Sequence, residues 1–302
     1  MQKGDFKDEI AVLISKALVA ERRNQQEEAE ALLHEALQIA QKSDRQEAVT
    51  YTLDQMANLA LRNHQDDKAE KLIKETIKHL VANGFDKTSN AVVELSVKLA
   101  NIYSKFNKYE EAESGYDWCI TTLESKIQKV DDSNDLQEVK ESHEIEEEFD
   151  IKALLGMSLE NYAKLLTKQK RYAEAETAYL KAIEICQNDL STEENKHPQN
   201  VVLLNDLGAL YHLQKKYKEA ITYLEKAIET GKSVSHPYLS TALSNLASCQ
   251  MYMGDFESAK TNYRKSLQLA EKEGDRYTIK FIKDMVAQLE TERYLKEHKK
   301  AS

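Results

Sequence analysis

The sequence predicts an all-α protein, a right-handed α-solenoid of about six helical hairpins followed by a C-terminal capping helix. Glycine (8 residues) and proline (2 residues) are scarce in the 302-residue chain, which favours helices over strands and tight turns. A short pattern, in its fullest form an aromatic residue three positions before an alanine, recurs along the chain. A repeat of this length indicates a stack of helical units, each packed on its neighbours. The signature alanines are Ala29, Ala69, Ala112, Ala175, Ala220 and Ala259.

A second small residue lies twelve positions before each signature alanine. Where two antiparallel helices cross closely, only alanine or glycine leaves room for the neighbouring backbone. A bulky residue four positions after each signature alanine falls on the same helix face, where it can fill the next layer. We therefore predict one helical hairpin for each copy of the pattern. The earlier small residues are Ala17, Ala57, Ala100, Ala163, Gly208 and Ala247, and the bulky ones are Leu33, Ile73, Tyr116, Tyr179, Leu224 and Tyr263.

The hairpins follow one another within a single repeat domain that spans residues 1–302. Polar breaks such as Asn63-His64-Gln65 and Gln169-Lys170-Arg171 indicate the turn inside a hairpin. His197-Pro198 and His236-Pro237 indicate helix starts, because proline in the first turn removes only an N–H that has no helical partner. The six hairpins are expected near residues 10–43, 48–83, 90–130, 150–190, 198–234 and 237–274.

An acidic insertion at residues 131–150 lengthens the interval between Ala112 and Ala175. It contains ten acidic side chains and one lysine, Lys140. We interpret it as extensions of the flanking helices joined by a solvated loop. A tolerated surface insertion and a partner-binding element both fit this composition.

The last helix is expected at residues 276–298, where it caps the apolar face of the final hairpin. Its predicted buried stripe is Tyr277, Phe281, Met285, Leu289 and Leu295.

The charge and the cysteines exclude several functional classes. The net charge of −10 argues against nucleic acid as a partner. Cys119, Cys186 and Cys249 are odd in number and far apart, which favours buried thiols over disulfides or metal sites. His34-Glu35 and His143-Glu144 are not followed by the second histidine of a zinc-protease helix, and no glycine-rich phosphate loop is present. We expect no enzymatic activity, no metal and no cofactor.

A binding groove is expected along the first helix of each hairpin. Polar residues near the middle of these helices are the candidate contacts, because asparagine can both donate to and accept from an extended peptide backbone. The candidates are Asp54, Asn58, Arg62, Asn101, Lys105, Glu160, Lys164, Asn205, Ser244 and Ser248.

The repeat pattern resembles the tetratricopeptide repeat, most closely at Leu207-Gly208-x-x-Tyr211 followed by Ala220. Gln26 and Asp66 replace the turn aromatic in the first two copies. Repeats of 39–45 residues with His-Pro starts and asparagine in the helices also resemble the kinesin light chain. That second resemblance implies a cytosolic adaptor that binds peptides or cargo.

A more extensive resemblance runs from Asp8 to about residue 290, to a mitochondrial family of tetratricopeptide repeat proteins. It implies association with the inner membrane and with respiratory complex III. It also implies a role in clearing N-terminal fragments of the Rieske iron–sulfur subunit. We expect membrane anchoring only through an upstream segment that this sequence does not contain. The segments that carry the resemblance are Glu28–Leu37, Ala48–Ala60, Asn90–Ala100, Gly115–Ile120 and Leu154–Met157.

Overall fold

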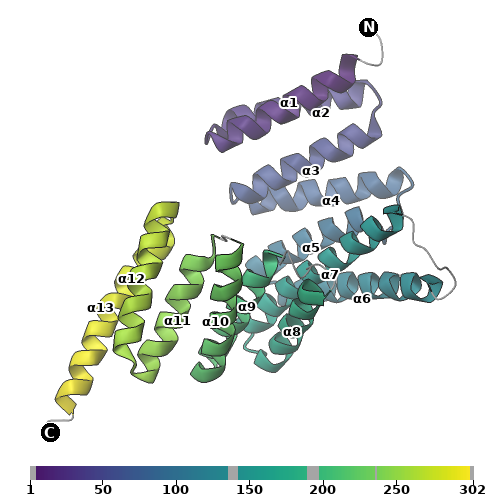
Figure 1. The fold of residues 1–302 in the computed structure, drawn as a ribbon. Coiled ribbons are helices and arrows are strands. Elements are labelled where there is room, and N and C mark those ends of the chain that lie inside the picture. The colour runs from purple at the N-terminus through teal and green to yellow at the C-terminus, as the bar shows by residue number, and fades with distance from the viewer. Residues whose placement is uncertain (1–4, 135–141, 189–196, 235–236, 300–302) are drawn as a thin grey trace. The chain divides into compact units, whose positions relative to one another are not determined.

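The computed structural model describes residues 5–134, 142–188, 197–234 and 237–299, and over these ranges the chain forms α-helices and no strand (Figure 1). The predicted all-α class is therefore confirmed. The helices belong to two compact units, Met1–Thr122 and Leu123–Ser302.

The first unit consists of antiparallel hairpins. From α1 (Asp5–Arg22) to α5 (Asn90–Lys105), each helix packs on the next along the chain, and α1 also contacts α3 (Gln46–Arg62). A continuous apolar core, from Ile10 on α1 to Ile102 on α5, runs through these helices. Its elements are α1 (Asp5–Arg22), α2 (Gln26–Lys42), α3 (Gln46–Arg62), α4 (Asp66–Ala82), α5 (Asn90–Lys105) and the N-terminal part of α6 (Tyr109–Asn134).

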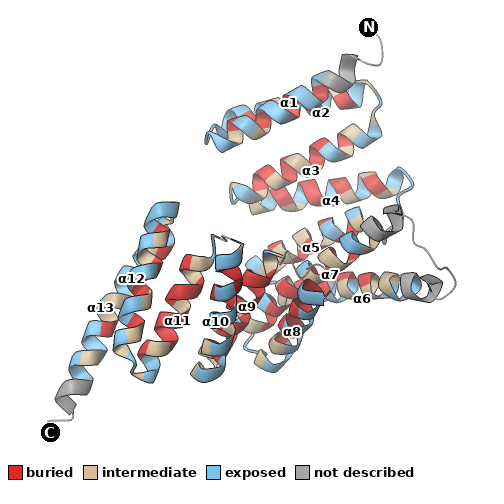
Figure 2. Ribbon diagram, viewed as in Figure 1, coloured by how far each residue is buried: buried red, intermediate tan, exposed pale blue. Residues whose placement is uncertain are grey.

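The second unit, from Leu123 to the last helix, also consists of helices that pack on their neighbours along the chain. Its first helices are covered on more sides than its second helices, because α9 and α11 also contact one another and α11 contacts α13. Ten of the fifteen residues of α9 are buried, against six of the seventeen in α10 (Figure 2). The further elements are α7 (Ser142–Lys168), α8 (Tyr172–Asn188), α9 (Gln199–Leu213), α10 (Tyr217–Ser233), α11 (Leu239–Met253), α12 (Phe256–Glu273) and α13 (Arg276–Lys299).

Each hairpin turn closes with one residue in the left-handed conformation. At the α7–α8 turn, Lys170 has φ 63°, and its N–H donates to Thr167 O (3.0 Å) while the N–H of Arg171 donates to Leu166 O (2.9 Å). This pair of bonds is the Schellman motif, which satisfies carbonyls that the helix end would leave free. The Ala175 N–H then donates to Arg171 O (3.0 Å), so the second helix starts at once. The left-handed residues are Asn24, His64, Asn107, Lys170, Lys215 and Gly254.

The small residues lie at the helix crossings, as the repeat predicts. All six signature alanines are completely buried, and so are their bulky partners Ile73, Leu224 and Tyr263. At Gly208, an added Cβ would lie 2.6 Å from Leu224 Cγ and 3.3 Å from the carbonyl oxygen of Ala220. The crossing of α9 and α10 is therefore too close for any side chain at position 208.

The capping helix α13 is present, but its predicted buried stripe was partly wrong. Leu289 is buried, whereas Tyr277 is 83% exposed and Phe281 37% exposed. The helix turns Thr278 and Ile282 towards α12 instead, and the hydroxyl and N–H of Thr278 both donate to Asp275 at the helix start. Asp275 therefore caps α13, and the polar Thr278 that donates to it is buried, whereas the predicted Tyr277 next to it is exposed.

The acidic insertion at residues 131–150 includes the end of α6 at Asn134 and the start of α7 at Ser142. Both flanking helices therefore extend into residues 131–150, as predicted. The connecting residues 135–141 lie outside the described residues. The single-domain interpretation of residues 1–302 stays a prediction.

We predict that Gly208→Ala lowers the free energy of unfolding by about 1–3 kcal/mol, because its methyl group overlaps Leu224. Gly156→Ala is the matched control, since the nearest atom to its Cβ is Ile185 Cγ2 at 3.9 Å and alanine is the better helix former. Chemical denaturation of both variants measures the difference. Equal stabilities would contradict the close crossing of α9 and α10.

Candidate functional site

An apolar hollow of about 570 Å³ opens in the first unit between α3, the end of α4 and the start of α5. Leu80 and Leu95 contribute to its wall, and two aromatic side chains line it while remaining exposed, Tyr51 at 53% and Phe85 at 47%. Large exposed aromatic rings beside an apolar hollow are typical of protein-interaction sites. We call this feature the Tyr51 hollow.

Carboxylates surround the Tyr51 hollow. Glu47, Asp54 and Glu94 line it, and among the described residues that line it there is no lysine or arginine. Lys98 lies beside it, with Nζ 2.9 Å from Asp54 Oδ1 and 3.0 Å from Glu94 Oε1. Burial opposes the charge of Lys98, but the two carboxylates outweigh burial and raise the pKa of Lys98. Three carboxylates against one ammonium group leave the hollow with net negative charge.

A second hollow, of about 710 Å³, adjoins the first across Tyr51. It is lined by α1 and the start of α3, and it shares Gln46, Glu47 and Tyr51 with the Tyr51 hollow. Ile10, Ile14 and other residues of α1 form its apolar wall. The two hollows together make a groove over α1, α3 and α5, which are the first helices of their hairpins. We refer to them jointly as the first-helix groove.

Only one candidate predicted from the sequence, Asp54, lines the Tyr51 hollow. Asn58 donates to Asp54 Oδ2 (2.9 Å) and orients that carboxylate. Arg62 pairs with Glu21 of α1 (2.8 Å from Nη2 to Oε2), so it connects two hairpins. The other two candidates of this unit also have internal partners: Asn101 accepts from Tyr116 Oη, and Lys105 pairs with Asp66.

In the second unit the structure brings three candidates together in a polar ladder. Lys164 on α7 pairs with Glu160, and its Nζ lies 3.4 Å from Asp206 Oδ2 on α9. Burial raises the pKa of Asp206, while Asp206 and Glu160 outweigh the burial of Lys164 and raise its pKa. Asn205 then donates to Asp206 (3.1 Å) and accepts from Asn245 of α11 (2.9 Å). The ladder therefore joins the first helices of three hairpins.

The last two candidates, Ser244 and Ser248, are buried. The Ser244 hydroxyl donates to Thr241 O (2.9 Å) within α11. The Ser248 hydroxyl lies 2.8 Å from Tyr263 Oη and donates to Ser244 O (3.0 Å). In this structure both hydroxyls contribute to helix packing.

The described residues contain no cluster of histidine, cysteine and carboxylate side chains that could hold a metal ion. Burial raises the pKa of Cys119 and Cys249 to about 12 and that of Cys186 to about 11, so all three remain thiols at neutral pH. Among the described helices, none combines the length and the apolar character that a membrane crossing requires.

Family models match hairpins in both units. The tetratricopeptide repeat model matches residues 154–233 and 202–272. The model of anaphase-promoting complex subunit 5 matches residues 9–64 and 22–92. The repeat assignment therefore rests on the sequence as well as on the helices.

Curated relatives cover most of the chain. Tetratricopeptide repeat protein 19, mitochondrial, of Rattus norvegicus is 37% identical over 281 residues, which are 93% of this chain and 74% of the rat protein. The chain belongs to the tetratricopeptide repeat protein 19 family. The Homo sapiens member of the family is 35% identical over 281 residues, 93% of this chain and 72% of the human protein. Both members carry the designation mitochondrial in their names.

A solved structure shows the same fold outside the family. The tetratricopeptide-like repeats of a putative kinesin light chain from Podosopora anserina match with a TM-score of 0.53, over 74% of this chain and 95% of that chain. The sequences are 15% identical. This likeness concerns the fold alone.

Sequence reasoning missed most of the residues that form the Tyr51 hollow. Tyr51 lies three positions before Asp54, hence on the same helix face, and this spacing could have identified it. Phe85 follows Gly84 in the α4–α5 connection, outside any helix pattern. Lys98 meets Asp54 across 44 residues of sequence, and no local signal gives that contact.

We predict that Ser248→Ala lowers the free energy of unfolding by about 1–3 kcal/mol, because it leaves the buried Tyr263 hydroxyl without its partner. Adding Tyr263→Phe should recover part of this loss, as the orphaned hydroxyl is then removed. Ser244→Ala is the control, since it leaves no side chain unpaired. Thermal or chemical denaturation measures the free energy of unfolding of all three variants. A neutral Ser248→Ala variant would contradict the packing role.

Proposed function

We propose that this chain is a non-enzymatic protein-binding scaffold that associates with respiratory complex III at the mitochondrial inner membrane. There it supports assembly or maintenance of the complex, including clearance of N-terminal fragments of the Rieske iron–sulfur subunit. Membership of the tetratricopeptide repeat protein 19 family supports the mitochondrial location, and the partner is what the resemblance to that family implies.

The observation that carries the binding role is the Tyr51 hollow, in which exposed aromatic rings sit beside apolar walls and carboxylates. Tyrosine is enriched among the residues that dominate binding energies, because its ring buries a large area at a small entropic cost. The carboxylates favour a partner segment with lysine or arginine next to an apolar side chain. A polypeptide segment of this kind fits the first-helix groove.

The scaffold binds its partner and does not cut it. The three cysteines are buried thiols, and two of the carboxylates that line the Tyr51 hollow, Asp54 and Glu94, pair with Lys98. Hydrolysis of a bound fragment would therefore fall to a protease supplied by another protein. The negative net charge of −10 disfavours nucleic acid as a partner of any of these surfaces.

The alternative of a cytosolic adaptor similar to the kinesin light chain has less support. The likeness to the kinesin light chain repeats is one of fold, at 15% identity, whereas the family relatives reach 37%. No contact in the described residues favours kinesin cargo over another peptide.

We predict that the pair Tyr51→Ala with Phe85→Ala reduces capture of complex III by about tenfold or more, because the hollow loses both exposed rings. Purified tagged chain is incubated with detergent-solubilised mitochondria, and complex III subunits in the eluate are quantified. The matched control is Tyr277→Ala with Phe281→Ala, which removes the same two residue types from the exposed face of α13.

Two outcomes would contradict this proposal in different ways. Absence of complex III subunits from the wild-type eluate would contradict the association itself. If both variant pairs lost the same amount of complex III capture, the association would stand, but the first-helix groove would not be its site. Thermal unfolding of both pairs checks that the folds are preserved.

A further inference from the structure

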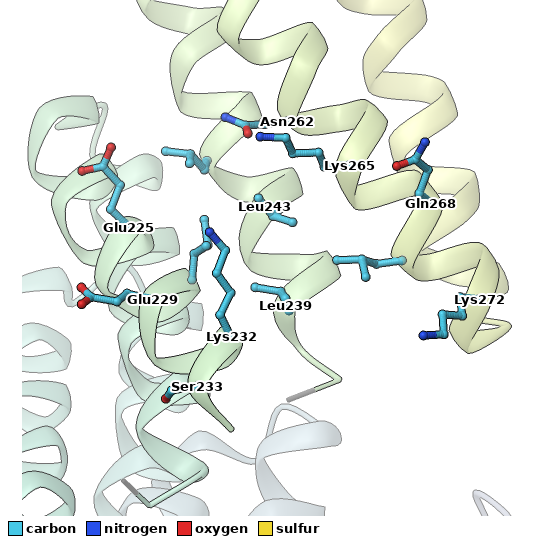
Figure 3. A pocket seen from close by; sticks show the side chains of 13 residues that line it. Glu225, Glu229, Lys232, Ser233, Leu239, Leu243, Asn262, Lys265, Gln268 and Lys272 are labelled. Atoms are coloured by element: carbon cyan, nitrogen blue, oxygen red, sulfur yellow. The ribbon is translucent and has the colours of Figure 1, made fainter. Parts of the chain in front are cut away.

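A second groove, of about 1000 Å³, lies in the second unit between α10 and α12, with α11 as its floor (Figure 3). Leu239, Leu243 and Leu246 form the floor, at positions i, i+4 and i+7 of α11. Leu243 and Leu246 are buried under the walls, so the floor is an apolar stripe parallel to the helix. We call this feature the α11 groove.

Three lysines line the α11 groove: Lys232 from α10, and Lys265 and Lys272 from α12. In Figure 3 the Lys232 side chain extends from its helix towards the middle of the groove, and Lys265 reaches in from the opposite wall. Other lysines of this unit, such as Lys164 and Lys260, are paired with carboxylates. Among the described residues, no carboxylate lies within ion-pair distance of these three.

The two walls of the α11 groove differ in charge. The α12 wall consists of Asn262, Lys265, Gln268, Leu269 and Lys272 and contains no carboxylate. The α10 wall contains Glu225 and Glu229 in addition to Lys232. In Figure 3 both glutamate side chains point away from the leucine floor. An acidic ligand would therefore turn its carboxylates towards α12 and towards the end of α10.

We propose that the α11 groove binds an acidic amphipathic helix of a partner protein. The apolar spacing i, i+4, i+7 on α11 matches the apolar face of such a helix, which is the helix-in-groove mode of recognition. Lys265 and Lys272 are seven residues apart, which is two helical turns and a rise of about 10.5 Å. Two carboxylates with the same spacing on the partner helix fit this pair.

The α11 groove shares no lining residue with the first-helix groove, and the proposal for it does not depend on binding to complex III. The Tyr51 hollow is lined by carboxylates, whereas the α11 groove is lined by unpaired lysines around leucines. The two grooves therefore favour segments of opposite charge. A chain that carries both can hold an acidic and a basic segment at the same time.

The test uses the whole chain and an 18-residue fluorescent helical peptide with leucine at i, i+3, i+4 and i+7 and glutamate elsewhere. Anisotropy measures its binding beside that of a peptide with lysine in place of glutamate. We expect the glutamate peptide to bind and its affinity to fall with added salt. The combined substitutions Lys232→Glu, Lys265→Glu and Lys272→Glu should weaken binding about tenfold or more.

The matched control is Lys218→Glu, Lys280→Glu and Lys283→Glu, which makes the same charge change at exposed lysines outside the groove. It should retain the affinity within about twofold. Lys→Gln at the three groove positions replaces the charge-reversed variant if that variant fails to fold, as judged by circular dichroism. Leu243→Gln should also weaken binding, because the floor contributes as well as the charge.

Three results would overturn the proposal. In the first, the glutamate peptide does not bind the wild-type chain. In the second, the groove substitutions and the control substitutions weaken peptide binding equally, which would show that total charge alone attracts the peptide. Alternatively, vesicles of phosphatidylcholine and phosphatidylglycerol bind through the three groove lysines while the peptide does not. The groove would then recognise an anionic membrane surface.

Discussion

The close crossing of the two helices in each hairpin is the constraint on which the rest of the structure depends. Completely buried alanines occupy the signature position in all six hairpins, and at Gly208 even a methyl group would overlap Leu224. The turn must reverse the chain within a few residues to bring the small sites together. Five of the six turns place a non-glycine residue in the left-handed conformation, at a cost of about 1–2 kcal/mol each. Packing of the crossings outweighs this strain.

Once the hairpins are packed, the polar candidates predicted on the first helices have partners inside the chain. The Glu160–Lys164–Asp206–Asn205 ladder and the Ser248–Tyr263 bond connect neighbouring helices of the second unit. Such bonds make the stack rigid but leave little polar surface for a ligand. The candidate ligand sites are where side chains lack internal partners or remain exposed: the aromatic rings at Tyr51 and Phe85, and the lysines of the α11 groove.

The fold was predictable because its determinants are local. A small residue, a second one twelve positions earlier and a bulky residue four positions later identify a hairpin without knowledge of its neighbours. The stripe of α13 was misassigned because Thr278, which donates to the helix-capping Asp275, is buried while Tyr277 is not. The candidate site was predicted only in part, since Asp54 lies on the expected face. Its pairing with Lys98 and the position of Phe85 depend on how successive hairpins stack, and no short sequence pattern encodes that.

We propose that this family member holds its partner in the first-helix groove. Photocrosslinking from position 51 tests it most directly, with a photoreactive phenylalanine in place of Tyr51 and detergent-solubilised mitochondria as the source of partners. The same replacement of Tyr277, which is more exposed, controls for chance encounters. We expect cross-links to complex III subunits or Rieske fragments from position 51 and few from position 277. Cross-links to these proteins from position 277 alone would contradict it.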